Sequence, residues 1–459
     1  MSEHFDVIVI GAGQAGPPLA ARCGREGLKV ALIERDQMGG TCVNNGCVPT
    51  KTLVASARVA ALARRAAEYG VMLDQPPRVD MVRVKARKDA IVEASRAGVT
   101  NWMAGTKNVS VIHGHARFSG AHQIEVGGRT LSAKRIFINV GGRPTTTKLA
   151  GIEGVPYLNN VSMMEVDFVP QHLIVVGGSY IGLEFAQIYR RFGAEVTVCE
   201  MGPRLIGRED EDVSDEVRAI LEREGIAVRT GATCLSVARR DNGVTVGAAC
   251  DTGVPNIEGS HLLLATGRTP NTGDLGLDRA GIVADAHGFI TVNDQLETNV
   301  SGVYAVGDVN GRGAFTHTSW NDYEIVAANL FDGDSRRVTD RIPTYALFTD
   351  PPLGRVGMSF KEARASGRPL LGAKMPMTRV GRAREAGETQ GFMKIVVDTE
   401  TRRILGAAVL GLSGDEVVQS ILEVMAADVA YTSISRGMHI HPTVTELVPT
   451  LLEGLKPLD

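Results

Sequence analysis

The chain contains the same strand–turn–helix–strand pattern twice, and this repeat restricts its fold more than any other feature. In the first copy an apolar run over 6–10 leads into the glycine-rich turn 11–16. A helix of small residues follows, and a second apolar strand ends in Glu34, 23 residues after Gly11. Such glycines let a diphosphate approach the backbone closely, and the acid binds ribose hydroxyls. The pattern predicts a parallel-sheet, dinucleotide-binding domain, in which the binding residues are Gly11, Gly13, Gly16 and Glu34.

The second copy lies near the middle of the chain. An apolar strand leads into the turn 177–182, and after a helix a further strand ends in Glu200. Glu200 follows Gly177 by 23 residues, the same spacing as in the first copy. Ser179 occupies the position where the central glycine is usual, so a decayed copy is the alternative to a second working site. The matched spacing favours two working sites, and hence two dinucleotides.

Length and composition set the broad class of protein. A chain of 459 residues is too long for one ordinary core and predicts two to four domains. Lys and Arg number 49 against 52 Asp and Glu, without a basic or acidic block, so neither nucleic acid nor a membrane surface is expected as a partner. Neither a secretory leader nor a membrane-spanning segment is expected, because the first residues lack a basic stretch with a cleavage site and no apolar run is long enough. Six cysteines are too few for a disulfide framework, which favours a reducing, cytoplasmic location.

Two cysteines, Cys42 and Cys47, lie five positions apart in a glycine- and asparagine-rich stretch. Gly46 permits a bent backbone between them, and Pro49 suits the first turn of the helix that should follow. Cys47 would then lie at a helix N-terminus, where a thiolate is stabilised. A loop this short gains little stability from a disulfide, so the pair is interpreted as a redox couple. A bare pair at this spacing more often marks two buried cysteines, and only its context favours the redox interpretation.

The character of the chain changes from about Arg341, where prolines precede a glycine-rich β region and a helix over 415–428. This part is predicted to be a third domain of α+β type. Before it, a strand over 303–306 ends in Gly307 and Asp308. An acid at the carboxyl end of a buried strand binds a ligand hydroxyl or caps the next turn, and the sequence leaves both roles open.

Several motifs together carry a resemblance to a known family. They are G-G-T-C-V-N-N-G-C-V-P-T-K, the two glycine-rich turns, A-T-G-R-T-P-N, Y-A-V-G-D and H-P-T-V-T-E. With these the chain resembles, over its whole length, the class I pyridine nucleotide–disulfide oxidoreductases. The segments T-K-T-L and F-T-D-P-P are most similar to those of mercuric-reductase-like bacterial oxidoreductases. The resemblance implies an FAD-binding domain in two parts, 1–148 and 275–340, an NAD(P)-binding domain over 149–274, and a dimerisation domain over 341–459.

The resemblance also implies roles for individual residues. Cys47 is the thiol that meets the flavin, and Cys42 is the thiol that exchanges with substrate. Lys51 and Glu184 form an ion pair beside the flavin, as burial of a lysine requires. An acid–base pair reaches the active site from the other subunit of a homodimer, and its members are His441 and Glu446. The residues expected around FAD and the nicotinamide nucleotide are Gly11, Gly13, Gly16, Glu34, Gly40, Thr41, Asp308, Gly177, Gly182, Glu200 and Gly267.

The expected enzyme passes electrons from a nicotinamide nucleotide through FAD and the Cys42–Cys47 disulfide to a small disulfide or another oxidised substrate. NADH is expected before NADPH, because Glu200 would repel a 2′-phosphate, although Arg204 lies close by. No metal site is expected. A reductase of Hg(II) or Cu(II) is the alternative, but the tail from Leu447 has no cysteine to pass on a soft metal. A redox sensor or an assembly subunit is the alternative from another class.

Overall fold

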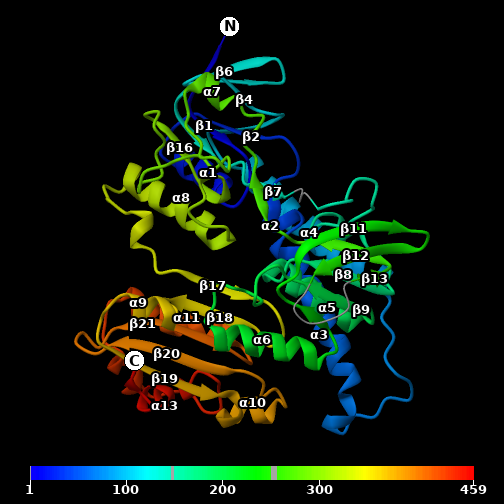
Figure 1. Cartoon of the computed structure of the whole chain (residues 1–459). Coiled ribbons are helices and arrows are strands. Elements are labelled where there is room, and N and C mark those ends of the chain that lie inside the picture. The colour runs from blue at the N-terminus through cyan, green and yellow to red at the C-terminus, as the bar shows by residue number, and fades with distance from the viewer. Residues whose placement is uncertain (1, 146–148, 250–255, 459) are drawn as a thin grey trace.

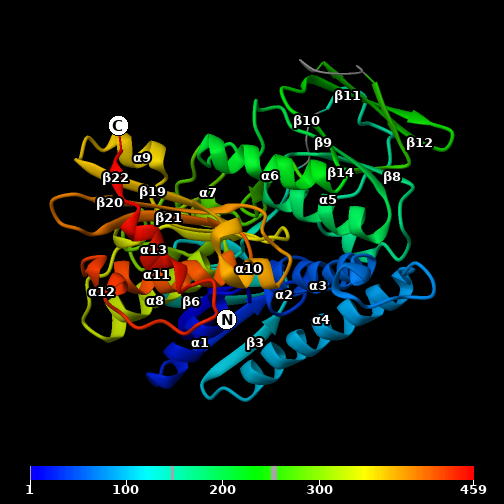
Figure 2. The same ribbon diagram turned by 90° about the horizontal axis from the view of Figure 1, so that it is seen from below.

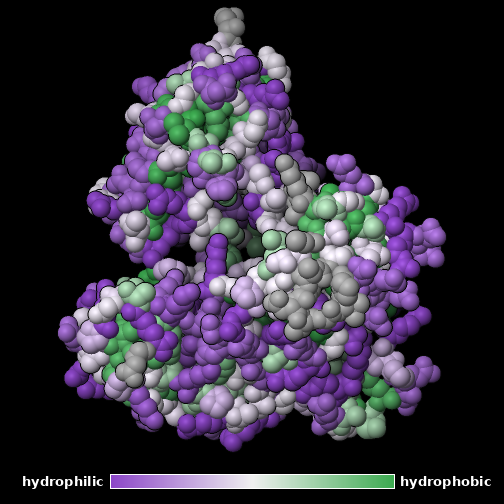
Figure 3. All heavy atoms as spheres, in the orientation of Figure 1, coloured by the Kyte–Doolittle hydropathy of each residue, from purple (hydrophilic) through white to green (hydrophobic). Residues whose placement is uncertain are grey.

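The computed structural model describes residues 2–145, 149–249 and 256–458. Lys148 at a predicted domain boundary, Cys250 and the terminal Asp459 lie outside the described residues. Three parts, each with its own sheet, meet at the centre of the molecule (Figure 1). The space-filling view shows the molecule hollowed where these parts come together (Figure 3).

The first part is built on a seven-stranded sheet of order β3-β2-β1-β6-β5-β4, with β16 paired to β6. β1, β2, β3, β6 and β16 run parallel, and most side chains of β1, β2 and β16 are buried, as expected inside a parallel sheet, whereas the edge strand β3 is partly exposed. The strands are β1 (Glu3–Ile10), β2 (Val30–Glu34), β3 (Val109–His113), β4 (Arg117–Gly120), β5 (Gln123–Val126), β6 (Arg129–Ile138) and β16 (Val303–Ala305).

Helices of the first part cover this sheet and reach toward the second part. α1 packs against β1 and β2, and the long helices α3 and α4 run side by side (Figure 2). Both prolines of α1 lie in its first turn, where they remove little backbone bonding. The helices are α1 (Gly16–Arg25), α2 (Gly40–Asn44), α3 (Cys47–Arg64), η1 (Ala66–Tyr69), α4 (Met81–Ala104), α7 (Leu277–Ala280), η3 (Gly307–Asn310) and α8 (Thr316–Phe331).

The second part repeats the parallel arrangement with the order β10-β9-β8-β14 and carries an antiparallel sheet, β11-β12-β13. A short ribbon, β7 with β15, joins it to the first part. The strands are β7 (Gly142–Pro144), β8 (His172–Val176), β9 (Glu195–Cys199), β10 (Ala227–Arg229), β11 (Thr233–Arg240), β12 (Gly243–Ala249), β13 (Asn256–Gly259), β14 (His261–Leu264) and β15 (Arg268–Pro270). The helices are η2 (Ser162–Glu165), α5 (Tyr180–Phe192) and α6 (Glu211–Arg223).

The third part is a six-stranded antiparallel sheet of order β17-β18-β21-β20-β19-β22, against which α11 and α13 pack. The helix predicted over 415–428 is α11, which ends two residues earlier. The strands are β17 (Thr344–Leu347), β18 (Leu353–Gly357), β19 (Leu370–Pro376), β20 (Phe392–Asp398), β21 (Ile404–Leu410) and β22 (Lys456–Pro457). The helices are η4 (Val338–Asp340), α9 (Phe360–Ala365), η5 (Met377–Arg379), α10 (Gly381–Glu385), α11 (Gly414–Ala426), α12 (Thr432–Ser435) and α13 (Leu447–Glu453).

Charged side chains at the start of α6 fasten the second part to the third. The carboxylate of Asp210 accepts hydrogen bonds from the backbone N–H groups of Phe360 and Lys361, each at 3.0 Å. The buried Lys394 lies between Asp210 and Asp212, 3.0 Å and 2.8 Å from their carboxylates. Buried ions are stable only when they are paired in this way, so the junction is held in one geometry.

The predicted fold class is confirmed: two Rossmann-like units precede an α+β domain. Among the residues that the structure describes, no helix combines the length and the apolar character needed to cross a membrane.

Candidate active site

The first glycine-rich turn holds Glu34 in a fixed orientation at the end of β2. One oxygen of the Glu34 carboxylate accepts the N–H of Ala12 at 2.7 Å, and the other accepts the N–H of Asp36 at 2.9 Å. Gly11 has a φ of +102°, and a Cβ there would lie 2.3 Å from the carbonyl oxygen of Asn139. Only glycine fits this position, and the carboxylate retains lone pairs that could accept ribose hydroxyls.

The second turn reproduces this geometry. The Glu200 carboxylate accepts the N–H groups of Gly178 at 2.6 Å and Gly202 at 2.7 Å. A Cβ on Gly177 would lie 2.4 Å from the backbone oxygen of Ala265. Ser179, the residue directly before α5, has an extended backbone with a φ of −111° and a ψ of −173°. Any residue can adopt this conformation, so the position does not require glycine. The second turn therefore keeps the shape of the first.

A cavity of about 1060 Å³ extends from the first glycine turn to the cysteine pair. Gly40 packs on the turn so closely that a Cβ on it would lie 2.7 Å from the Cα of Gly13. The lining of the cavity runs from the first glycine turn to the two cysteines, which suits an extended dinucleotide. The predicted site residues that line it are Gly11, Gly13, Glu34, Gly40, Thr41, Cys42, Cys47, Lys51, Glu184 and Asp308.

The two cysteines lie on either side of a break between helices. α2 ends at Asn44 and α3 begins at Cys47, which is the N-terminal position expected from the sequence. Gly46 joins the helices outside the left-handed region, with a φ of −131°. A Cβ on Gly46 would lie 2.7 Å from the backbone oxygen of Thr41, so close approach explains this glycine. Both thiols are free and half-buried.

The two thiols have opposite preferences for a proton. A hydrogen bond from Cys42 lowers the pKa of Cys47 to about 6, and the Thr316 hydroxyl and the Lys51 ammonium act in the same direction. The Thr316 Oγ1 atom lies 3.0 Å from the Cys47 Sγ atom. The pKa of Cys42 is raised above its usual value because its proton is shared with Cys47. The arrangement favours a thiolate at Cys47 and a thiol at Cys42.

Lys51 and Glu184 form the ion pair that the sequence predicted. The Lys51 Nζ atom lies 3.0 Å and 2.9 Å from the two carboxylate oxygens of Glu184. The Glu184 side chain is 5% exposed and that of Lys51 is 33% exposed. Because Lys51 lies one turn after Cys47 on α3, its charge acts on the thiolate.

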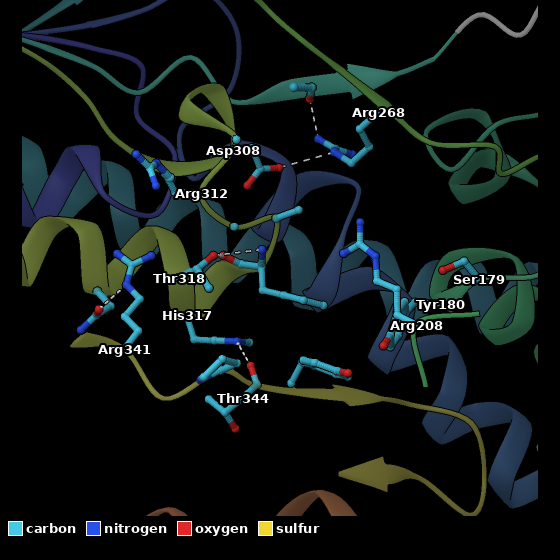
Figure 4. A pocket seen from close by; sticks show the side chains of 18 of the residues that line it. Ser179, Tyr180, Arg208, Arg268, Asp308, Arg312, His317, Thr318, Arg341 and Thr344 are labelled. Carbon is cyan, nitrogen blue, oxygen red and sulfur yellow. Dashed lines mark hydrogen bonds and ion pairs between the residues drawn. The ribbon is translucent and has the colours of Figure 1, made fainter. Parts of the chain in front are cut away.

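The side chains of Asp308 and Arg268 point toward each other (Figure 4). The Nε atom of Arg268 is 3.5 Å from the Asp308 carboxylate, and burial raises the pKa of Asp308. Gly267 precedes Arg268 with a φ of +131°, which positions the arginine at the start of β15. Both side chains line the first cavity and a second one.

The second cavity, of about 1800 Å³, begins at the second glycine turn. Gly177, Ser179, Tyr180 and Glu200 line it, and Figure 4 shows Ser179 and Tyr180 at the end opposite Arg312 and Arg341. The ring of Tyr180 stands edge-on to those of Phe315 and Tyr345, with centroids 5.8 Å apart in both pairs. These rings form the wall that the two cavities share.

His441 and Glu446 meet, but away from the cysteines. The His441 Nδ1 atom lies 2.9 Å and 3.0 Å from the Glu446 carboxylate oxygens. The His441 side chain is 80% exposed, and neighbouring Met438 and Ile440 are also exposed. Neither His441 nor Glu446 is among the described residues that line the cavity of Cys42 and Cys47. Within one chain the pair therefore faces outward.

Comparison with known families gives a direct match. The family model described as pyridine nucleotide-disulphide oxidoreductase matches residues 5–322. The model of that family's dimerisation domain matches residues 343–452. The chain belongs to this family. It is accordingly an FAD-dependent oxidoreductase that uses a nicotinamide nucleotide, and the dimerisation domain supports a homodimer.

Curated relatives in the family extend over nearly the whole chain. A probable pyridine nucleotide-disulfide oxidoreductase, RclA of Escherichia coli (strain K12), is 33% identical over 99% of this chain and 100% of its own length. A dihydrolipoyl dehydrogenase of Thermus scotoductus is 35% identical, over 99% of this chain and 96% of its own. A mercuric reductase of Lysinibacillus sphaericus is 30% identical, over 99% of this chain and 82% of its own.

Solved structures agree with these relatives. The HOCl-induced flavoprotein disulfide reductase RclA from Escherichia coli has a TM-score of 0.89 at 32% identity, covering 98% of this chain and 99% of that one. Its Cu(II) complex has the same TM-score and identity and covers 99% of both chains.

Two side chains that touch the predicted site were missed from the sequence. Thr316 contacts Cys47 across 269 positions of the chain and belongs to no recognisable motif. Phe348 lies over Lys51, and only its place in the F-T-D-P-P segment marked it. Both come from elements that fold back on the site, so no local pattern points to them.

Proposed function

We propose that this family member is an NADH-dependent flavoprotein disulfide reductase whose substrate is a small disulfide. The proposal rests on the difference in protonation between the two cysteines. Cys42 is favoured as a thiol and Cys47 as a thiolate, and both lie beside the Lys51–Glu184 pair. Such a thiol–thiolate pair delivers two electrons and one proton, and water supplies the second proton that reduction of a disulfide consumes. It must be regenerated by a reductant, and a reducing, cytoplasmic compartment suits it.

The first cavity fits FAD. Its glycines leave room for a diphosphate at the turn, Glu34 would bind the ribose of the adenosine, and Asp308 would bind a hydroxyl nearer the cysteines. FAD, when bound, takes up a hydride and delivers two electrons to a neighbouring disulfide, here the oxidised Cys42–Cys47 pair. Gly40 and Thr41 would hold its middle portion, and Lys51 would lie beside its reactive ring. These are proposed roles, as are the domain limits 1–148, 149–274, 275–340 and 341–459.

The nucleotide proposed for the second cavity is NADH. Glu200, at the end of β9, would accept the ribose hydroxyls and repel a 2′-phosphate. Arg204, the nearest arginine along the chain, is held 3.1 Å from Glu211 and 2.5 Å from Asp215. These two carboxylates would compete with a phosphate for Arg204, which supports NADH over NADPH. Gly177 and Gly267 would line the path of the dinucleotide, and Gly182 would support the site by letting α5 pack closely on the turn.

Cys42 would begin the reaction with substrate. It loses its proton to the neutral imidazole of the partner subunit's His441 and attacks one sulfur of the substrate disulfide. The S–S bond breaks, and the departing thiolate takes the proton back from the imidazolium. The Cys47 thiolate then attacks the Cys42 sulfur, which re-forms the protein disulfide and releases the second thiolate to be protonated by water. Glu446 would orient the imidazole and stabilise its charged form.

Reduction of a metal ion is the second candidate function. The solved relative in complex with Cu(II) favours it, and two thiols five residues apart are soft ligands. Hg(II) is less suited, because the described tail from Leu447 to Leu458 carries no cysteine to hand that ion inward. Cu(II) is therefore the metal to be compared with disulfides.

The test is anaerobic NADH oxidation by the purified FAD-loaded enzyme against small disulfides, quinones, Cu(II) and Hg(II). Saturable turnover with a disulfide, lost in both Cys42→Ser and His441→Ala, is the expected result. Faster turnover with Cu(II) that survives His441→Ala would assign the second function. If no acceptor is turned over, the chain is a redox sensor or an assembly subunit, and the proposal is wrong.

A further inference from the structure

A segment of the third part lies along one side of α5. The backbone N–H of Phe348 donates to Glu184 at 3.1 Å, and that of Asp350 donates to the side-chain oxygen of Gln187 at 2.8 Å. The Asp350 carboxylate lies 2.5 Å from both Arg191 and Arg58. Glu184, Gln187 and Arg191 follow one another at helical spacing, so α5 presents one continuous face to this segment. The segment is thus fixed to both α5 and α3.

Phe348 contacts both members of the ion pair beside the cysteines. Its N–H binds the Glu184 carboxylate, and the Lys51 Nζ atom lies 4.3 Å from the centroid of its ring. A cation over an aromatic face is attracted to the ring, most strongly where water is excluded. Phe348, Lys51 and Glu184 line the same cavity as Cys42 and Cys47. One residue of the third part, Phe348, therefore contacts both the Lys51 ammonium and the Glu184 carboxylate, which belong to the first and second parts.

The position of the Lys51 ammonium matters for the thiol next to it. Lys51 is a flexible side chain, a third exposed, and Glu184 alone fixes it from one direction. The titratable groups facing it are Glu184 from α5, Cys47 from its own helix and Cys42 from α2. The ring of Phe348 supplies the second contact that keeps the ammonium from turning toward solvent.

We propose that Phe348 is a positioning residue for Lys51, and that through it the docked third part sets the electrostatics of the Cys42–Cys47 site. This inference rests on the proposed function, because it takes Cys47 to be the thiolate beside the flavin. Phe348 thereby becomes a third member of the Lys51–Glu184 group. Its role in placing Lys51 gives a chemical reason why the 348–350 segment is hydrogen-bonded to α5.

The experiment compares Phe348→Leu, which removes the ring and keeps the N–H, with Phe348→Tyr, which keeps both. The two-electron-reduced FAD-loaded enzyme is titrated with acid while the long-wavelength thiolate–flavin absorbance is followed. In Phe348→Leu the midpoint should rise by about half a pH unit, because the ammonium stabilises the thiolate less. In Phe348→Tyr it should stay at the wild-type value. A midpoint that is unchanged or lower in Phe348→Leu overturns the proposal.

Two further measurements keep the result interpretable. Phe360→Leu is the control, because it removes a ring whose centroid lies 4.0 Å from another ammonium, that of Lys394. Neither Phe360 nor Lys394 lines the two cavities, so the midpoint should stay unchanged. Phe348→Met keeps apolar volume without a ring and replaces Phe348→Leu if that variant does not fold. The pH dependence of Cys47 alkylation by iodoacetamide, resolved by mass spectrometry, should show the same rise without relying on the flavin.

If wild type lacks the absorbance band, the proposed function itself fails; if wild type has it and Phe348→Leu titrates identically, only this inference fails.

Discussion

At the scale of single residues, the site depends on small differences between groups of the same type. Cys42 and Cys47 have the same side chain, but only Cys47 begins α3, and its sulfur lies 3.0 Å from the Thr316 hydroxyl oxygen. Glu34 and Glu200 each receive two backbone N–H groups at the end of a strand. Neighbouring side chains thus set the protonation state of Cys47, and backbone N–H groups set the orientation of the two glutamates.

The Thr316 hydroxyl should control how readily Cys47 ionises. Because the pKa of Cys47 is lowered to about 6, the thiolate should persist above that pH and be lost as the pH falls through it. Thr316→Val keeps the shape but removes the hydroxyl, so the midpoint of the thiolate–flavin band should rise by about one unit. Thr316→Ser should restore it, and equal midpoints in the Val and Ser variants would exclude the hydroxyl as a cause.

Glu200 should determine the choice of nucleotide. In Glu200→Gln the carboxylate no longer repels a 2′-phosphate, so kcat/KM for NADPH relative to NADH should rise about tenfold or more. The matched control is Glu195→Gln, at the exposed start of the same strand β9, which should leave the ratio unchanged. A wild-type enzyme that prefers NADPH would contradict the prediction and point to Arg204.

These residues differ in how far the sequence reveals them. Glu34, Glu200 and the glycines were predictable because their spacing recurs in each strand–turn–helix–strand unit, although the backbone that crowds Gly11 and Gly177 comes from elsewhere in the chain. Lys51 and Glu184 were identified only through a family resemblance, since 133 positions separate them. Thr316 and Phe348 could not be identified as contacts, because side-chain contacts between distant segments leave no periodic trace.

At the scale of elements, the break between α2 and α3 brings the two thiols together. The sequence predicted a bend at Gly46 and a helix from Cys47, and both are observed. It did not reveal why glycine is needed, because the obstacle is the backbone oxygen of Thr41, which becomes a neighbour only after the chain has turned.

Gly46→Ala should loosen this element. The added Cβ would lie 2.7 Å from the Thr41 oxygen, and relieving such overlap costs about 1–3 kcal/mol. The temperature at which flavin is released on heating should fall, and the thiolate–flavin band should weaken. Gly98→Ala is the matched control: it lies inside α4 with open space around its Cβ, so it should stabilise the helix by about 1 kcal/mol. A release temperature for Gly46→Ala at or above the wild-type value would refute this account.

At the scale of the whole molecule, the outward-facing His441–Glu446 pair would need a second copy of the chain in order to act on a cysteine pair. The family's dimerisation domain matches residues 343–452, which include this pair, and a two-fold axis would bring it to the partner's cysteines. The sequence indicated this only by resemblance, since a single chain contains no sign of what lies opposite an exposed histidine.

Mixed dimers test the shared site. In a dimer of one Cys42→Ser chain and one His441→Ala chain, one of the two sites combines both defects and the other has neither. Co-expressed and purified with two tags, this heterodimer should therefore have about half of the wild-type activity, while each parent homodimer is nearly inactive. Sedimentation should show a dimer throughout, and an active monomer would rule the arrangement out.

The strand β16 determines when the growing polypeptide can complete the sheet of its first part. Ribosomes add about 5–20 residues per second, so β16 follows β6 by roughly ten to thirty seconds. Until then the carboxyl half of β6 has no neighbour on that side, while every strand of the β10-β9-β8-β14 sheet has already been made. Asp308 emerges directly after β16. The nascent chain therefore completes the parallel sheet of its second part before that of its first.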